Sequence, residues 1–543
     1  MMQNIPQYFV AEAKTLQNYA KAVVHLRTRF QEGNLGLLFG AGISKSFGLP
    51  LWPALIERLA KHLNYTEYYS KIRDKPLPTI SKLLLTRFAF LKKKDFEKNK
   101  NFDTIIQGLW YAKLRDALYN DFPDTSEFYE KHPYINEFLE IILKSPLTIS
   151  FNFDSCIEMM LSGWQRNNKI PEKLYEAIDN GAVPFRGQKR GIIYHINGYI
   201  PRNPLESLGN KIVFSSDEFY KQKDEKIDGL YSTFEHCLSK YTYILLGLSL
   251  RDENFKSFLK QHAKNNPGHY HYYIKRITNL NTNHDDGYQA FREKLFDEYN
   301  LICLQLNDAE IAALARLIRY DYCGYFRNFA AMSGINTTWV YYLTGIPGSG
   351  KTTIARHMQS LRTYDEWLEE VLPLLKLPHT SLSPEVEYQA DCWIANQFAQ
   401  KNMKLLSEKE GIFLVDRAPL DPLSYRKQNE KISIKAKWYH EHLYQGDVNR
   451  DIKNGEILLL EGNIPDIASR IIYRTGNDSM NTNHLQELSK DLHSLYADKK
   501  VRIIKTNDLS IKEVVKKISK IIYLDGDYRE VNIARLLETI KQS

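Results

Sequence analysis

Apolar and polar positions alternate along the chain in a way that indicates short strands separated by helices. The first part of the chain holds five short apolar runs rich in β-forming residues, at 35–39, 147–151, 192–196, 243–246 and 301–306. Between them lie stretches with helical spacing of apolar residues, for example at 54–63 and 134–143. This alternation predicts a parallel sheet covered by helices.

A second series of the same kind follows. The pattern loosens around residues 324–333, and a new strand is predicted from Trp339 to Thr344. Further strands are predicted at 412–415, 457–460 and 501–504, and a helix at 511–522 is expected to close the domain. Since 543 residues suit two or three domains, we expect an α/β protein with two domains, 1–330 and 331–543. The segment 74–101 has no clear pattern.

Composition narrows the class of protein without naming an activity. Hydrophobic residues make up 43% of the chain and charged residues 25%, as in globular proteins. The net charge of +8 is mild and dispersed, so we do not expect a nucleic-acid partner. None of the five cysteines forms a Cys-x-x-Cys pair, which argues against a zinc ribbon. Without a signal-like start or an apolar run of spanning length, we expect a cytoplasmic protein with no membrane contact.

A complete phosphate-binding loop follows the predicted strand at 339–344. Residues 345–352 read Gly-Ile-Pro-Gly-Ser-Gly-Lys-Thr and lead into a helical pattern. Glycines let backbone N–H groups converge on a phosphate, the lysine reaches the β- and γ-phosphates, and the threonine hydroxyl can hold Mg²⁺. We therefore predict binding of ATP or a related nucleotide with Mg²⁺, through Gly345, Gly348, Gly350, Lys351, Thr352 and Thr353. The alternative is a degenerate loop that binds nucleotide without turnover.

Charged residues near later strand ends extend this candidate site. Asp416 ends the strand at 412–415 and is placed to hold Mg²⁺ or a substrate hydroxyl, with Arg417 beside it. Arg470 and Arg474 lie four residues apart, hence on one helix face, where they suit transferring phosphates. The alternative is an ordinary pair of surface arginines.

These motifs resemble the nucleoside and nucleotide monophosphate kinases, over roughly residues 338–525. The resemblance implies that Arg417 contacts the acceptor and that Arg470 and Arg474 belong to a lid. It names no acceptor, because the stretch 362–404 is divergent, and it leaves open whether phosphate is transferred at all.

Four polar clusters follow four predicted strands of the first domain. Because carboxyl ends of parallel strands meet at one edge of a sheet, we expect the clusters to form one site. They are Gly40-Ala41-Gly42-Ile43-Ser44, Ser150-Phe151-Asn152-Phe153-Asp154, Tyr194-His195-Ile196-Asn197-Gly198 and Gly247-Leu248-Ser249-Leu250-Arg251-Asp252-Glu253-Asn254.

The order of these clusters resembles the sirtuin-like NAD-binding family, over about residues 25–310. The resemblance implies a Rossmann-like parallel sheet that binds NAD⁺ through Gly40, Ala41, Gly42, Ser44, Asn197, Gly247, Ser249, Asp252 and Asn254. Two departures stand out: the four-cysteine zinc ribbon of deacetylating sirtuins is missing, and Lys45-Ser46-Phe47-Gly48 replaces their Asp-Phe-Arg element. Both are similar to the bacterial antiphage-defence branch, whose members hydrolyse NAD⁺.

Cleavage of the nicotinamide–ribose bond needs a positioned water, a proton acceptor and stabilisation of an oxocarbenium-like transition state. Asn152 can orient a water or hold a ribose hydroxyl, and Asp154 can bind ribose or stabilise positive charge. His195 suits general-base work, because its ordinary pKa is near neutral. One alternative stays open: in sirtuins the histidine directly precedes a glycine, and here Asn197 has that place.

Three functions agree with this sequence. We favour an NAD⁺ hydrolase that acts in antiphage defence and releases nicotinamide and ADP-ribose, with the kinase-like domain as its nucleotide sensor. The others are a working kinase with a regulatory NAD- or ADP-ribose-binding domain, and a non-catalytic nucleotide-binding scaffold. Expected partners are small-molecule nucleotides, a phage-derived trigger and further copies of the chain, because self-association is common in the defence family it resembles.

Overall fold

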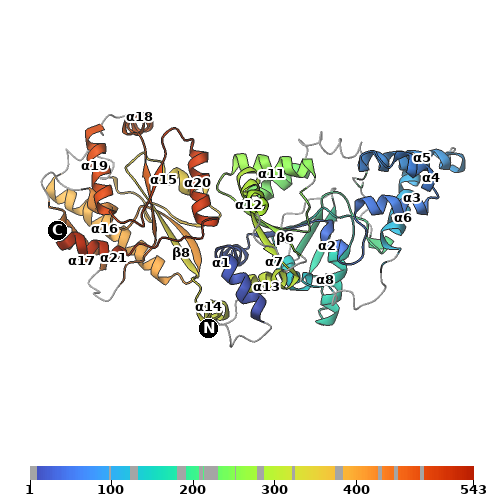
Figure 1. The fold of residues 1–543 in the computed structure, drawn as a ribbon, viewed down its shortest axis with the longest axis horizontal. Coiled ribbons are helices and arrows are strands. Elements are labelled where there is room, and N and C mark those ends of the chain that lie inside the picture. Colours follow the sequence, from blue (N-terminus) through green and yellow to red (C-terminus); the bar gives the residue numbers. More distant parts are fainter. Residues whose placement is uncertain are drawn as a thin grey trace.

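The part of the chain that the structure describes folds into two all-parallel sheets with helices around them (Figure 1), which confirms the predicted α/β fold class. The computed structural model describes residues 9–96, 99–120, 122, 132–179, 191–206, 212, 214, 230–250, 252–277, 286–320, 324–373, 383–425, 431–444, 451–476 and 482–542. Within these ranges, no helix combines the length and the hydropathy that crossing a membrane would require.

The first sheet has seven strands in the order β3-β4-β2-β1-β5-β6-β7. They are β1 (Leu35–Phe39), β2 (Thr148–Ser150), β3 (Tyr175–Asp179), β4 (Gly191–His195), β5 (Thr242–Leu246), β6 (His271–Arg276) and β7 (Leu301–Leu306). All five predicted strands are confirmed. From the central β1 the chain moves first to one side of the sheet and then to the other, so the carboxyl end of β1 is a topological switch point, where such sheets bind ligands.

Helices cover both faces of this sheet, and four of them form a lobe at the far end of the molecule (Figure 1). The lobe consists of α3 (Trp52–His62), α4 (Thr66–Ile72), α5 (Leu77–Phe96) and α6 (Phe102–Tyr119), so most of the unclear segment 74–101 is helical. The others are α1 (Val10–Gln31), α2 (Ala41–Lys45), α7 (Ile135–Lys144), α8 (Cys156–Asn167), the 3-10 helix η4 (Pro204–Glu206), α10 (Leu230–Lys240), α11 (Glu253–Asn265), α12 (Asp286–Tyr299), α13 (Asp308–Arg319) and α14 (Tyr325–Met332).

The second sheet has five strands in the order β12-β11-β8-β10-β9. They are β8 (Thr338–Thr344), β9 (Arg362–Tyr364), β10 (Gly411–Asp416), β11 (Glu456–Glu461) and β12 (Arg502–Lys505). Around them lie α15 (Lys351–His357), α16 (Pro384–Ser407), the 3-10 helix η9 (Asp421–Ser424), α17 (Ile432–Tyr444), α18 (Ile464–Thr475), α19 (Thr482–Leu495), α20 (Ile511–Tyr523) and α21 (Ile533–Gln542).

The prediction that the helix at 511–522 closes the second domain is wrong. That helix exists as α20, but α21 follows it and buries Ile533 and Leu537 beside Tyr439 of α17. The apolar residues of α21 have helical spacing, so this last helix was detectable from the sequence.

Helix α1 lies between the two sheets and joins them (Figure 1). A single hydrophobic core contains Leu26 of α1, Tyr272 of β6 and Leu414 of β10. The boundary placed near residue 330 stays a prediction, and buried residues on both sides of it share this core.

The imidazole of His25 connects the two halves inside the core. Its Nε2 lies 2.8 Å from the carbonyl oxygen of Ser360, and its Nδ1 lies 2.7 Å from the hydroxyl of Tyr272. Because a carbonyl only accepts, Nε2 carries the proton and Nδ1 accepts from the tyrosine. Burial lowers the pKa of His25 to about 3, so the neutral ring is the stable form.

A second line of contacts joins α20 and α15 to the first half. The Nζ of Lys512 donates to the carbonyl of Lys264 at 2.7 Å, and Lys520 pairs with Asp297 at 3.2 Å. Gly268 lies so close to the end of α15 that a Cβ there would be 2.4 Å from the carbonyl oxygen of His357. Only glycine allows this approach, so the helix that begins at the P-loop ends against the first half.

We expect His25→Ala to lower the free energy of unfolding by about 1–3 kcal/mol at neutral pH, because it leaves the Ser360 carbonyl unpaired. The unfolded imidazole takes up a proton below about pH 6.5, whereas the folded one resists protonation down to about pH 3. This contribution to stability is therefore complete above about pH 6.5 and is lost as the pH falls towards 3.

Thermal unfolding followed by circular dichroism at several pH values between about 5 and 8 measures both effects. His25→Ala should show a smaller loss of Tm on acidification than the wild type. His236→Ala, which alters an exposed histidine of α10, is the control. Equal acid sensitivity in wild type and His25→Ala would contradict the assignment of a neutral, buried His25.

Candidate functional site

The loops after β1 and β5 pack backbone against backbone at the switch point. The amide of Gly40 donates to the carbonyl of Leu246, and that of Gly42 to the carbonyl of Gly247, both at 2.9 Å. A Cβ on Gly42 would lie 2.8 Å from Gly247 Cα, and one on Gly247 would lie 2.7 Å from Ile43 N. Gly247 also has a φ of +70°. These glycines are therefore needed to bring the two loops together.

Asn152 brings the loop after β2 into the same place. Its Nδ2 donates to the carbonyl of Gly40 and to the hydroxyl of Ser44, each at 3.0 Å. Asp154 accepts from the amide of Cys156 at 3.1 Å, and burial raises its pKa. The structure thus brings together three predicted residues, Gly40, Ser44 and Asn152, with Asp154 two positions further along the same loop.

His195 lies behind this loop, fully buried at the end of β4. Its Nδ1 is 2.9 Å from the backbone oxygen of Asn152, and its Nε2 is 2.7 Å from Oε1 of Glu158. Burial disfavours the imidazolium, but the carboxylate of Glu158 outweighs it and raises the pKa of His195. Both ring nitrogens are engaged, so the ring has no lone pair directed at solvent in this arrangement.

The role of His195 as general base therefore stays a prediction, and its contacts also suit a positioning role. By bonding the backbone of Asn152, the ring fixes the loop that carries the Asn152 amide. The alternative residue, Asn197, is half-buried and donates from Nδ2 to the carbonyl of Phe151 at 3.1 Å. Glu158 did not emerge from the sequence, although it follows Asp154 by four residues on the first turn of α8.

The other predicted NAD-binding residues lie around this edge. Ala41 is exposed on α2, and Ser249 is exposed on the loop after β5. Asp252 caps α11, since its Oδ1 accepts from the amide of Phe255 at 3.2 Å. The side chain of Asn254 and all of Arg251 lie outside the described residues.

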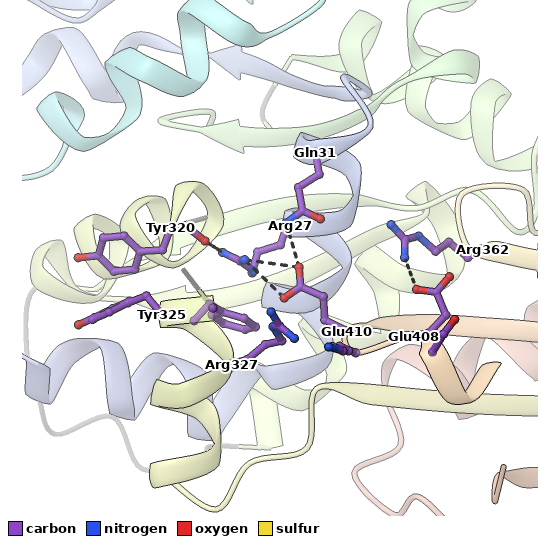
Figure 2. A pocket seen from close by; sticks show the side chains of 12 residues that line it. Arg27, Gln31, Tyr320, Tyr325, Arg327, Arg362, Glu408 and Glu410 are labelled. Atoms are coloured by element: carbon purple, nitrogen blue, oxygen red, sulfur yellow. Dashed lines mark hydrogen bonds and ion pairs between the residues drawn. The ribbon is translucent and has the colours of Figure 1, made fainter. Parts of the chain in front are cut away.

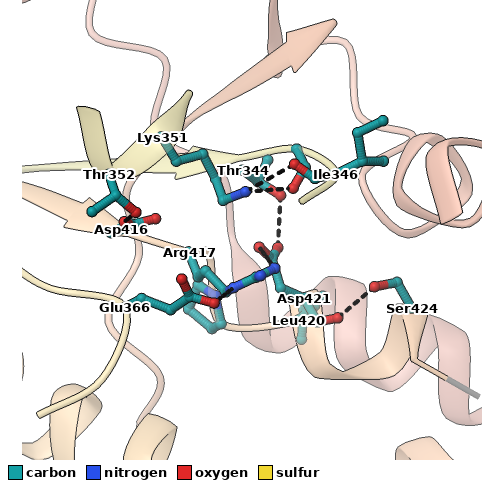
Figure 3. A network of polar contacts seen from close by, with 12 residues as sticks. Thr344, Ile346, Lys351, Thr352, Glu366, Asp416, Arg417, Leu420, Asp421 and Ser424 are labelled. Carbon is teal, nitrogen blue, oxygen red and sulfur yellow. Dashed lines mark hydrogen bonds and ion pairs between the residues drawn. The ribbon is translucent and has the colours of Figure 1, made fainter. Parts of the chain in front are cut away.

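The P-loop forms a second site at the carboxyl edge of the second sheet (Figure 3). Gly345, Gly348 and Gly350 have φ values of +147°, +79° and +100°, which favour glycine. The Nζ of Lys351 turns back onto the loop and donates to the carbonyls of Gly345 at 2.8 Å and Ile346 at 3.1 Å. Burial lowers the pKa of this lysine to about 8. Thr353, two residues after Lys351, is exposed.

The two residues predicted to hold Mg²⁺ are in direct contact. The hydroxyl of Thr352 donates to Oδ2 of Asp416 at 2.6 Å, and burial raises the pKa of Asp416. A hydroxyl beside a carboxylate is an oxygen donor set of the kind Mg²⁺ takes, completed by waters and phosphates. Among the described residues, no group of three or more His, Cys, Asp or Glu side chains could hold a metal by itself.

Arg417 is held in an ion-pair network beside this pair (Figure 3). Its Nε lies 2.6 Å from Oε1 of Glu366, and its φ of +74° is unusual for a residue with a side chain. Asp421, 3.9 Å from the same guanidinium, accepts from Thr344 at 2.7 Å and Tyr496 at 2.8 Å. Sequence reasoning missed Glu366 and Asp421. Asp421 follows Arg417 by four residues, but Arg417 lies outside a helix with a φ of +74°, so this spacing gave no signal.

Helix α18 lies over the P-loop, where a lid would be expected. A Cβ on Gly348 would meet Ile471 at 2.8 Å and Ile467 at 3.1 Å, so this helix packs directly on the loop. Arg470 and Arg474 are exposed on the same helix. Their role in a lid stays a prediction.

In a comparison with known proteins, a family model matches the part of the chain that holds most of the first site. Residues 146–303 match the family model of the SIR2-like domain, a range that includes Asn152, His195 and Asp252. No curated protein sequence matches the chain. Among solved structures, one similar chain is a deoxyadenosine kinase from M. mycoides with the products dCMP and a flexible dCDP bound. It is 14% identical, with 33% of this chain and 96% of that chain covered and a TM-score of 0.26.

A TM-score this low carries no argument, so the kinase-like character of the second half depends on its own residues. For the first half, by contrast, the comparison adds support. Its sheet and the match at 146–303 together support a sirtuin-like domain and an NAD-related activity.

Proposed function

We propose that this protein is an NAD⁺ hydrolase that acts as an antiphage-defence effector and is regulated by nucleotide binding in its second half. The observation that carries the proposal is the Asn152 amide bonded to Gly40 and Ser44 at the switch point of a sheet with a SIR2-like match. The absence of any Cys-x-x-Cys pair favours hydrolysis over zinc-ribbon-dependent deacetylation.

The proposed reaction breaks the bond between ribose C1′ and the nicotinamide nitrogen. The bonding electrons leave with nicotinamide, which becomes neutral, and a water oxygen bonds to C1′ and loses a proton. Asn152 orients the water or a ribose hydroxyl, and Asp154 stabilises positive charge that develops on the sugar. His195 is the proposed proton acceptor, for which it must exchange its bond to Glu158.

We expect Asn152→Ala and His195→Ala each to abolish nicotinamide release, and Glu158→Gln to separate the two roles of His195. If His195 is the base, loss of the carboxylate lowers its pKa, and the acidic limb of the kcat/KM–pH profile moves to lower pH. If His195 only positions the loop, kcat falls while that limb stays in place.

Chromatographic assay of nicotinamide, with a thermal unfolding scan of every variant, measures these effects. The exposed His236→Ala serves again as control and should retain full activity. Undiminished release of nicotinamide by folded Asn152→Ala and His195→Ala would refute the proposed reaction.

For the second half we propose binding of ATP or a related nucleotide with Mg²⁺. Lys351→Ala should weaken binding by about 1.5–3 kcal/mol, because it removes a charge-assisted contact to phosphate. Wild-type affinity should also decrease as the pH rises through about 8, where the buried ammonium loses its proton. Calorimetry with Mg-ATP measures both effects, with Lys437→Ala as control, since Lys437 is exposed on α17. Equal affinities in Lys351→Ala and Lys437→Ala would rule out this site.

We further propose that the nucleotide controls NAD⁺ hydrolysis. Support comes from the shared core and from Gly268, which packs against the end of the P-loop helix. A nucleotide can regulate only by binding active and inactive states with different affinity. NAD⁺ turnover should therefore change with at least one member of a panel of nucleotides and nucleosides in the wild type, and not in Lys351→Ala. Identical turnover in both proteins under all conditions would show two independent halves.

A further inference from the structure

A cavity of about 330 Å³ lies between the two halves, away from both sites described above (Figure 2). We call it the seam pocket. Arg27 of α1, Tyr320 and Arg327 of the first half and Glu408 and Glu410 of the second half line it. Its volume is near the lower end of the range for small-molecule sites, which suits a compact ligand.

Two arginines of the seam pocket are already used by the protein. The guanidinium of Arg27 donates to the carbonyls of Leu317 at 2.5 Å and Tyr320 at 2.6 Å and lies 3.9 Å above the ring of Phe326. Arg362 pairs with Glu32 at 3.2 Å and with Glu408 at 3.1 Å. These contacts hold the two halves together and fix the pocket walls.

Arg327 differs from both. It is half-buried in the pocket wall, and in the described part of the chain it has neither a hydrogen bond nor an ion pair. Lys409, exposed at the rim, adds a second cation. Figure 2 shows Arg327 directed into the same space as Glu410. A half-buried guanidinium without a carboxylate partner favours an anionic ligand, above all a phosphate.

Two further features select for a planar group and for hydroxyl or amino donors. Tyr325 is 37% exposed, and its ring packs among Phe329, parallel within 4°, Tyr320, edge-on at 5.0 Å, and Phe9 at 6.2 Å. The carboxylate of Glu410 accepts from Gln31 at 2.9 Å and pairs with Arg27 at 3.4 Å, and its oxygens keep further lone pairs. An aromatic side chain, a cation and an acceptor that line one pocket are suited to a base, a phosphate and a ribose.

We propose that the seam pocket is a separate binding site for a nucleoside monophosphate. The phosphate pairs with Arg327, the base lies on Tyr325, and a ribose hydroxyl or an exocyclic amine donates to Glu410. Because its walls come from both halves, an occupant contacts both at once. This inference does not depend on NAD⁺ hydrolysis or on nucleotide binding at the P-loop.

The test is calorimetry on the full chain carrying Lys351→Ala, which removes the P-loop lysine. The probes are AMP, adenosine and inorganic phosphate. AMP should bind more tightly than either fragment. Adding Arg327→Ala should weaken AMP binding by about tenfold or more, as expected for a lost charge-assisted contact. Arg535→Ala, an exposed arginine of α21, is the matched control and should have no effect.

Tyr325→Ala separates the two parts of the proposal. It should weaken binding of AMP and leave binding of inorganic phosphate unchanged. Thermal unfolding of each variant confirms folding, and among the residues that the structure describes Arg327 has no hydrogen-bond or ion-pair partner whose loss would disturb it. Equal AMP affinity in the Arg327→Ala and Arg535→Ala proteins would overturn the proposal, as would the lack of saturable AMP binding. If phosphate binds as tightly as AMP and Tyr325→Ala has no effect, the nucleoside assignment is wrong.

Discussion

One constraint shapes the whole molecule: helix α1 packs against both sheets at once. The hydrogen bonds of His25 follow from it. The apolar side chains of α1 belong to a core that includes β6 on one side and β10 on the other. Its polar atoms do the same work, because the His25 ring bonds Tyr272 in the first half and Ser360 in the second. A buried ring with both nitrogens satisfied has little freedom to move, so the relative position of the halves is set by groups that cannot be hydrated.

Each candidate site lies at the edge of a sheet where its parallel strands end. At the first edge, glycines permit backbone contact and an amide joins the loops. At the second, a buried lysine occupies carbonyl oxygens and a hydroxyl bonds a buried carboxylate. Both edges hold charged or polar groups away from water. For this reason burial lowers the pKa of Lys351 and raises the pKa of Asp416, and each shift favours the neutral form of the side chain.

Sequence patterns predicted the elements that are apolar and local, and failed where partners are distant or polar. Strands such as β1 and β7 were found because nearly every residue in them is apolar. β6 was missed because it reads His-Tyr-Tyr-Ile-Lys-Arg, whose histidine and tyrosines are buried all the same. The three-residue β9 is too short to show a pattern. Within the sites, the P-loop and the Asn152 cluster were readable as motifs. Glu158 and Glu366 were not, because their importance arises from contacts across space with His195 and Arg417.

The position of α1 also has a consequence for biosynthesis. Its partner Ser360 is 335 residues further along the chain. At ordinary elongation rates of about 5–20 residues per second, roughly 20–70 s separate the synthesis of the two. During that interval, the face of α1 that later meets β10 has no partner, although the first sheet can already form beside it. A chain interrupted between the halves would leave that face of α1, with His25, in contact with water, and surface exposed in this way during synthesis favours misassembly.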